Sequence, residues 1–153
     1  MKTRKFWLLP ALALSAATAY AGYIQPNPVS IDVFEDSGSA RGDMITARNS
    51  DNDFEFIGCG VRKYDLGNGE YYSWGFCQAQ VEEDTSYVCE TEDEELMEGM
   101  NALATASYIS FSWVEEEAFD FEGNPFTYLR CIGIGSSTQS FYLSADKEAN
   151  KKK

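Results

Sequence analysis

Alternating apolar and polar residues predict several short β-strands along this chain. The clearest alternation covers residues 108–114, where Ile109, Phe111 and Trp113 would share one face. Side chains point to opposite faces of a strand in turn, so this period of two indicates strands with one buried face. The same pattern, or a run of β-branched and aromatic residues, predicts strands at residues 29–34, 40–48, 54–63, 71–81, 86–89, 126–134 and 140–143. We expect an acidic loop at residues 115–124 and a last hairpin turn at residues 136–138.

One segment has helical rather than alternating periodicity. Within residues 92–104, Leu96 and Met100 belong to a set of apolar residues spaced to form one helix face. Thr91 and Glu94 have the spacing of a capping box, which would start the helix there. The fold class is therefore mainly β, a β-rich α+β domain. We expect an antiparallel meander or sandwich with one α-helix packed on it.

The four cysteines predict two disulfides. Cys59, Cys77, Cys89 and Cys131 form an even set in a chain that we expect to be exported. A four-cysteine zinc site is the alternative, but it normally uses closely paired cysteines, and no two of these are close in sequence.

Two predicted turns place three of these cysteines in one row. A hairpin centred on Asn68 would set Cys59 opposite Cys77, and the next turn would set Cys77 opposite Cys89. Two pairings then remain open. We favour Cys77–Cys89 with Cys59–Cys131, which joins one local and one long loop, and the alternative is Cys59–Cys77 with Cys89–Cys131.

The first 21 residues are typical of a signal peptide. A basic start precedes a short apolar stretch, and Ala19 and Ala21 are small residues at the positions that a signal peptidase reads. Cleavage would leave a single domain at residues 22–145 and a charged tail at residues 146–153. No other long apolar run occurs, so we expect no membrane span in the mature chain and a periplasmic or secreted location.

Charge and composition exclude several functions. The chain carries a formal charge of −13 and no histidine. Removing residues 1–21 takes away three basic residues and no acidic one, which gives −16. Nucleic-acid binding needs clustered Lys and Arg, so we expect none. Ser-His-Asp and Cys-His catalysis are excluded because both need an imidazole, and no nucleotide-binding motif is present, so we expect no cofactor.

Few residues stand out as a candidate site. Asp51, Asp53 and Glu55 are weak candidates for a Ca²⁺ loop, because hard cations prefer carboxylate oxygens at alternating positions, although the EF-hand spacing is not met. Aromatic residues around Tyr72 and Trp74 are of the kind that lines sugar or peptide sites, although aromatics in a hairpin more often form a core.

A series of short motifs follows the signal peptide. In chain order they are Ser39-Ala40-Arg41-Gly42, Ala47-Arg48, Ile57-Gly58-Cys59, Ser107-Tyr108-Ile109-Ser110-Phe111-Ser112-Trp113 and Cys131-Ile132-Gly133-Ile134. This order resembles a family of small exported bacterial proteins whose function is not established. The resemblance implies an exported, disulfide-bonded fold and no particular activity. The acidic segment at residues 115–122 departs from the family pattern by its length.

Three functions fit these observations. The first is an acidic, non-enzymatic binding domain whose partner is a cationic protein or an envelope surface component; inhibition of a cationic hydrolase is its most concrete form. The second is a glycoside hydrolase that uses two carboxylates on a cell-wall or polysaccharide substrate. The third is a Ca²⁺-stabilised structural or adhesive module. A groove with aromatic walls and two carboxylates would favour the second, and a broad acidic face without a cleft would favour the first.

Overall fold

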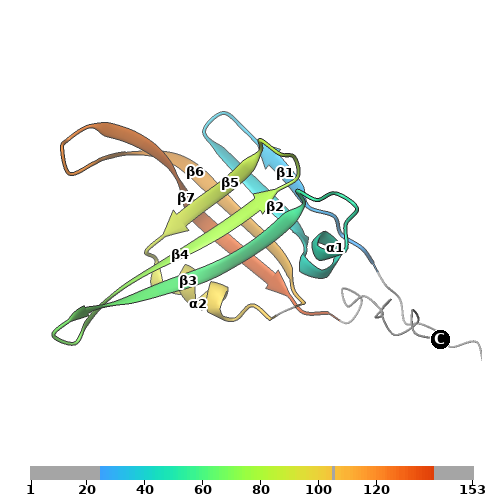
Figure 1. Cartoon of the computed structure of the whole chain (residues 1–153), viewed down its shortest axis with the longest axis horizontal. Coiled ribbons are helices and arrows are strands. Elements are labelled where there is room, and N and C mark those ends of the chain that lie inside the picture. Colours follow the sequence, from blue (N-terminus) through green and yellow to red (C-terminus); the bar gives the residue numbers. More distant parts are fainter. Residues whose placement is uncertain (1–24, 105, 140–153) are drawn as a thin grey trace, which may run out of the picture.

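The computed structural model describes residues 25–104 and 106–139, and it shows one mixed seven-stranded sheet with two short helices (Figure 1). In chain order the elements are β1 (Ser30–Val33), β2 (Ser37–Asp43), α1 (Met44–Arg48), β3 (Phe56–Gly67), β4 (Glu70–Gln80), β5 (Ser86–Thr91), α2 (Glu94–Asn101), β6 (Tyr108–Phe119) and β7 (Pro125–Ser137). The strand order is β1-β2-β6-β7-β5-β4-β3, and only β5 and β7 pair in parallel. The predicted mainly β fold with two disulfides is confirmed.

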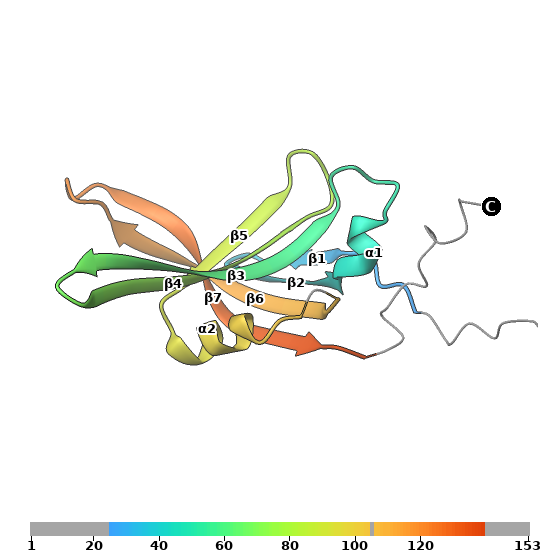
Figure 2. The ribbon, with the colours of Figure 1, turned by 60° about the horizontal axis from the view of Figure 1, so that its bottom comes forward.

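The sheet folds over its own inner face. Strands β3, β4 and β5 run steeply across β1, β2, β6 and β7 (Figures 1 and 2). The core lies between these two halves, where the Tyr87 ring of β5 stacks on the Trp113 ring of β6 with centroids 5.2 Å apart. Backbone pairing joins the halves over only two residue pairs, starting at Cys89 and Leu129. The two halves are therefore held together mainly by side-chain packing and by the Cys89–Cys131 disulfide.

Two long hairpins extend beyond the core as separate arms (Figure 2). The β3–β4 arm (residues 61–74) turns at Gly67, Asn68 and Gly69, whose φ angles of 85°, 58° and 81° are all left-handed. Glycine and asparagine tolerate this region best, which is why this sequence makes a tight turn here. The register pairs Cys59 with Cys77, so the predicted hairpin centre is confirmed.

The β6–β7 arm (residues 115–130) replaces the acidic loop that the sequence predicted at residues 115–124. That prediction is wrong because β6 continues to Phe119, with Glu117 paired to Thr127 across the hairpin. The predicted turn at residues 136–138 is also wrong, since β7 runs through to Ser137. The predicted strand at residues 140–143, the signal peptide at residues 1–21 and the tail at residues 146–153 lie outside the described residues.

The row of three cysteines is confirmed, and the favoured disulfide pairing is wrong. Cys77 lies opposite Cys59 on one side and opposite Cys89 on the other. The disulfides are Cys59–Cys77 and Cys89–Cys131. Strand β7 lies beside β5 and not beside β3, so Cys131 reaches Cys89 and leaves Cys77 for Cys59.

Both helices differ in part from the prediction. Residues 44–48 form α1 instead of the end of the predicted strand 40–48, because the Asp43 carboxylate caps the helix by accepting from Thr46 N at 2.7 Å. The predicted helix at residues 92–104 is shorter, and it begins at Glu94 with Asp93 as its cap instead of Thr91. Its predicted packing on the sheet is confirmed, since α2 contacts β3, β4 and β7.

Candidate binding groove

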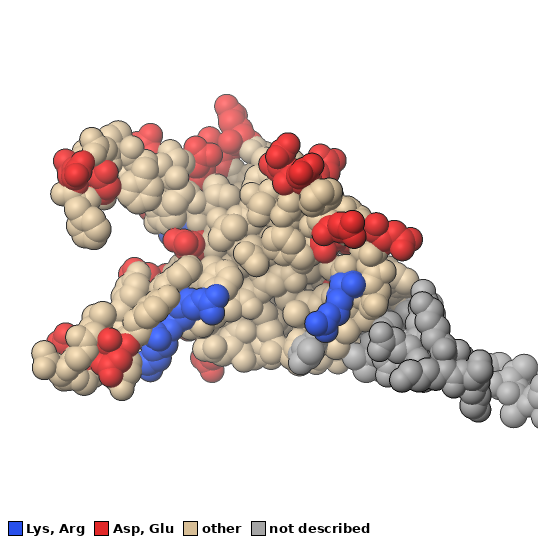
Figure 3. Space-filling view, viewed as in Figure 1, with Lys and Arg blue, Asp and Glu red and all other residues tan. Residues whose placement is uncertain are grey.

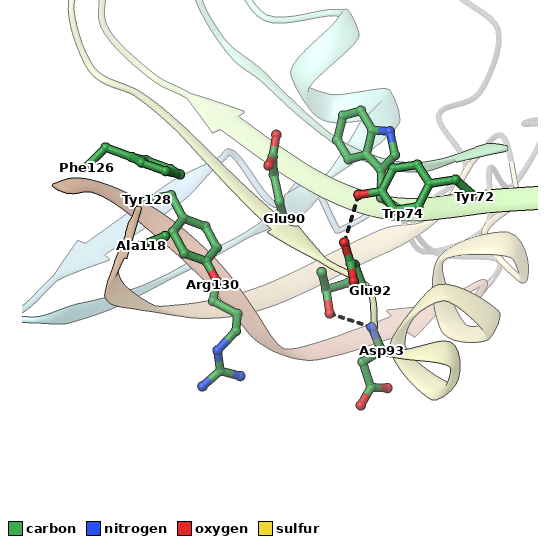
Figure 4. A pocket seen from close by; sticks show the side chains of 10 residues that line it. Tyr72, Trp74, Glu90, Glu92, Asp93, Ala118, Phe126, Tyr128 and Arg130 are labelled. Carbon is green, nitrogen blue, oxygen red and sulfur yellow. Dashed lines mark hydrogen bonds between the residues drawn. The ribbon is translucent and has the colours of Figure 1, made fainter. Parts of the chain in front are cut away.

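A groove of about 650 Å³ opens between the two arms. Figure 3 shows the molecule hollowed at this place, and Figure 4 shows the side chains that line it. Strand β4 provides one wall and β7 the other, while the end of β5 and the link to α2 form the base between them. The lining residues are Tyr72, Trp74, Glu90, Thr91, Glu92, Asp93, Ala118, Phe126, Tyr128 and Arg130.

Aromatic rings form both walls of the groove. Tyr72 and Trp74 alternate on β4, and Phe126 and Tyr128 alternate on β7. Residues two apart on a strand share a face, so each arm directs two rings into the same space. Phe126 and Tyr128 lie with ring centroids 6.1 Å apart. The rings are only partly buried, which leaves aromatic surface available to a ligand.

Three carboxylates lie along the base of the groove. Glu92 accepts a hydrogen bond of 2.7 Å from the Tyr72 hydroxyl (Figure 4). Asp93 caps α2 by accepting from Leu96 N at 2.9 Å. Glu90 is exposed, and it has no hydrogen-bond or ion-pair partner among the described residues. At least one carboxylate of the groove is therefore available for an incoming cation.

The cationic residue that lines the groove is already paired. The Arg130 guanidinium bonds the Glu116 carboxylate of β6 through Nε. The same carboxylate also accepts from the Tyr128 hydroxyl at 3.4 Å. Glu116 cancels the charge of Arg130, so Glu90, Glu92 and Asp93 leave the groove with a net negative charge.

The two tyrosines of the groove have raised pKa values. The hydrogen bond to Glu92, with smaller effects from burial and from the charges of Glu92 and Glu90, raises the pKa of Tyr72 above its ordinary value. Burial and the Glu116 charge raise the pKa of Tyr128 as well, although Arg130 opposes this. Ionisation of Tyr72 would break its hydrogen bond to Glu92 and add a negative charge beside it, and ionisation of Tyr128 would place a charge in a partly buried position beside Glu116.

The predicted Ca²⁺ candidates occupy a different part of the molecule. Asp51 and Asp53 are exposed in the loop before β3. Glu55 instead accepts from Val29 N at 2.7 Å and from the Ser50 hydroxyl, which fixes the loop to the start of β1. No group of three or more His, Cys, Asp or Glu side chains in the described ranges could hold a metal ion. Neither described helix is both long and apolar enough for a membrane crossing.

The turn at the end of the β6–β7 arm is held by one carboxylate. Asp120 accepts from Asn124 N at 2.8 Å, from Asn124 Nδ2 at 3.0 Å and from Glu122 N at 2.9 Å. The hydrogen bonds from Asn124 do most to lower the pKa of Asp120 below its ordinary value of 3.8. The turn presents Phe121, whose side chain is fully exposed.

We expect this turn to loosen only in strong acid. Since the pKa of Asp120 is lowered by folding, its contribution is complete above 3.8 and is lost as the pH falls through the lowered value. Amide exchange at Glu122 and Asn124, followed by NMR against pH, should accelerate below that point relative to the intrinsic rate. In Asp120→Asn the acceleration should be absent; an unchanged profile in this variant would contradict the assignment.

Sequence reasoning found half of the groove. It singled out Tyr72 and Trp74 as an aromatic set that could line a site, and both line this groove. It missed the opposite wall: residues 126–134 were predicted as a strand, but with residues 115–124 interpreted as a loop nothing predicted the long hairpin arm that brings this strand opposite β4. The available signal was the alternation on the far side of that segment, where Phe126, Tyr128 and Arg130 recur at a spacing of two.

No family model and no curated protein matches the sequence, and no solved structure matches the fold. The resemblance to small exported bacterial proteins therefore stays a prediction.

Proposed function

We propose that this chain is a non-enzymatic binding protein that captures a cationic segment of another protein in the groove between its arms. The observation that carries the proposal is the composition of the groove: four partly exposed aromatic rings surround a base of carboxylates, and its one cationic lining residue is neutralised by Glu116. Inhibition of a cationic hydrolase is the concrete form that we favour.

The chemistry of the groove suits a Lys or Arg side chain. A cation over an aromatic face is stabilised by roughly 0.5–2 kcal/mol, with the larger values where water is displaced. A carboxylate that accepts a hydrogen bond from the same cation adds a charge-assisted contact. Glu90 lies within this aromatic groove and has no partner in the described chain, so it supplies such an acceptor. The hydrogen bond to Glu92, with smaller effects from the charges of Glu92 and Glu90, raises the pKa of Tyr72, which supports a negative potential there.

The charge of the whole chain supports the same kind of partner. The formal charge is −13, and acidic side chains are spread over the surface in Figure 3. A field of this sign accelerates encounter with a cationic protein, and added salt weakens the effect. Both disulfides suit an oxidising compartment, which supports an exported protein and an exported or extracellular partner.

A glycoside hydrolase is the second candidate, because a groove with aromatic walls and carboxylates is the feature expected of a hydrolase from the sequence, and the structure has it. Its general acid would need a protected environment that raises the carboxyl pKa above its ordinary value. Glu90, Glu92 and Asp93 are all solvent-exposed, and Asp93 is engaged as the cap of α2. These features favour binding over hydrolysis.

Peptide binding tests the proposal directly. The mature, oxidised chain should bind a fluorescent seven-residue peptide of alternating Lys and Thr, and it should not bind the Glu–Thr counterpart. Tyr72→Ala should weaken binding of the basic peptide about tenfold, as loss of one cation–aromatic contact predicts. Fluorescence anisotropy at low and physiological salt measures both effects.

Tyr71→Ala is the matched control. Tyr71 is the adjacent residue on β4, but its ring packs under Lys63, with Nζ 4.7 Å from the centroid, and does not line the groove. This variant should bind within about twofold of the wild-type chain. Equal loss in both variants, or equal binding of the basic and acidic peptides, would contradict the proposal. Release of reducing ends from a polysaccharide, abolished by Glu90→Gln, would favour the hydrolase instead.

A further inference from the structure

We propose that the captured segment binds as an added β-strand on the free edge of β4, in an extended conformation with basic residues at alternate positions. This inference rests on the proposed function and specifies how the partner is held. Three structural features support it. Pairing between β5 and β4 ends at Gly75, and the chain is turned away into α2 at that point. Carboxylates lie beside the edge of β4 that is left exposed.

Strand β5 covers only part of its neighbour. Pairing between β4 and β5 runs from Gln80 opposite Ser86 to Gly75 opposite Thr91, and it ends there. The five residues of β4 nearest the tip of the arm, Glu70–Trp74, pair with β3 on one side only. Their other edge has no strand partner in the described chain, so backbone N–H and C=O groups face solvent there.

The chain is turned away from β4 at a specific point. Thr91 Oγ1 accepts from Asp93 N at 3.1 Å, and Asp93 then caps α2. Helix α2 packs at Gly75, where an added Cβ would come within 2.6 Å of Met100 Sδ. The glycine lets the helix approach the strand closely. The chain therefore leaves the sheet plane after Thr91 and cannot extend along the rest of β4.

The edge that β5 vacates opens into the groove. Tyr72 and Trp74 belong to this free part of β4, and their side chains line the groove (Figure 4). A strand added here would place every second side chain on the same face as these two rings. Five residues of free edge extend about 17 Å, enough for an added segment of about five residues.

The carboxylates beside this edge suit a basic segment. The nearby cations of β3 reach across to rings of β4: the Arg62 guanidinium lies 5.2 Å from the Phe76 centroid, and Lys63 Nζ lies 4.7 Å from the Tyr71 centroid. Lys and Arg side chains follow this arm in Figure 3. Glu90 and Glu92 at the base of the groove attract a basic segment to the β4 edge.

Backbone N-methylation of the peptide tests strand addition. An added strand bonds β4 through every second N–H, whereas the intervening N–H groups point away. A scan that methylates one backbone nitrogen at a time in the alternating Lys–Thr peptide should therefore lower affinity at least tenfold at alternate positions. The other positions should change less than about threefold. Amide exchange within Glu70–Trp74 should slow on binding, again at every second residue.

A matched peptide tests the side-chain pattern. The same lysines and threonines arranged in two blocks keep the charge but lose the alternation, so affinity should fall at least tenfold. Suppose that the unmodified peptide binds, that methylation has no periodic effect, and that the block peptide binds equally tightly. This result would overturn strand addition and leave the proposed function standing. Failure of the unmodified peptide to bind at all would overturn both.

Discussion

Loss of the Cys89–Cys131 disulfide, in the variant Cys89→Ala/Cys131→Ala, should lower the free energy of unfolding by about 4 kcal/mol. The bond closes a sequence separation of 42 residues, and closing a long loop removes much conformational entropy from the unfolded chain. It also joins β5 to β7, where backbone pairing covers only two residue pairs. Domains of this size are stable by only about 5–15 kcal/mol, so the loss is severe.

The other disulfide is the matched control. Cys59–Cys77 closes a separation of only 18 residues, and it joins β3 to β4, which already pair along the whole hairpin. Cys59→Ala/Cys77→Ala should therefore lose less, about 3 kcal/mol. Urea unfolding followed by tryptophan fluorescence gives both values. If the Cys59–Cys77 variant is the less stable one, the bridge between the two halves of the sheet is not the critical connection.

The register of the β3–β4–β5 meander could be predicted because it is set locally. Gly67, Asn68 and Gly69 adopt left-handed φ angles, and that turn fixes which residues face each other. The alignment of Cys59 with Cys77 follows from counting outward from the turn. The residues of this turn therefore determine the register of this part of the fold.

The disulfide pairing could not be predicted in the same way. It depends on which strand lies beside β5, and β7 reaches that place through a parallel contact 40 residues away in sequence, between Cys89 and Leu129. No local signal in the sequence encodes that neighbour. Three aligned cysteines left two pairings open, and only the position of Cys131 decides between them.

The β6–β7 arm shows why polarity alone misleads. Glu115 and Glu117 are exposed, and Phe119, which shares their side of β6, is exposed too. Neither face of an extended hairpin arm is packed in a core, so its strands lose the apolar–polar contrast by which strands are recognised. The groove depends on this arm, so half of the candidate site escaped the sequence analysis with it.

Gly38→Ala should destabilise the fold by about 3 kcal/mol through overpacking. A Cβ at Gly38 would lie 2.3 Å from Trp113 Cζ2 and 2.9 Å from the Asp32 backbone oxygen. The Trp113 ring cannot move aside easily, because it is 2% exposed and packs against the rings of Tyr87 and Phe111. Gly38 of β2 pairs directly with Trp113 of β6. Removing the steric clash would therefore require β2 to separate from β6.

Gly58→Ala provides the contrasting case within the same sheet. A Cβ at Gly58 meets no atom within 4 Å, and alanine restricts the unfolded chain more than glycine does. This variant should be neutral or more stable by up to about 1 kcal/mol. Thermal and urea unfolding of both variants, with near-UV circular dichroism to report the Trp113 environment, separate the two effects. A Gly38→Ala protein as stable as Gly58→Ala, with an unchanged near-UV spectrum, would mean that Trp113 does not pack on β2 as described.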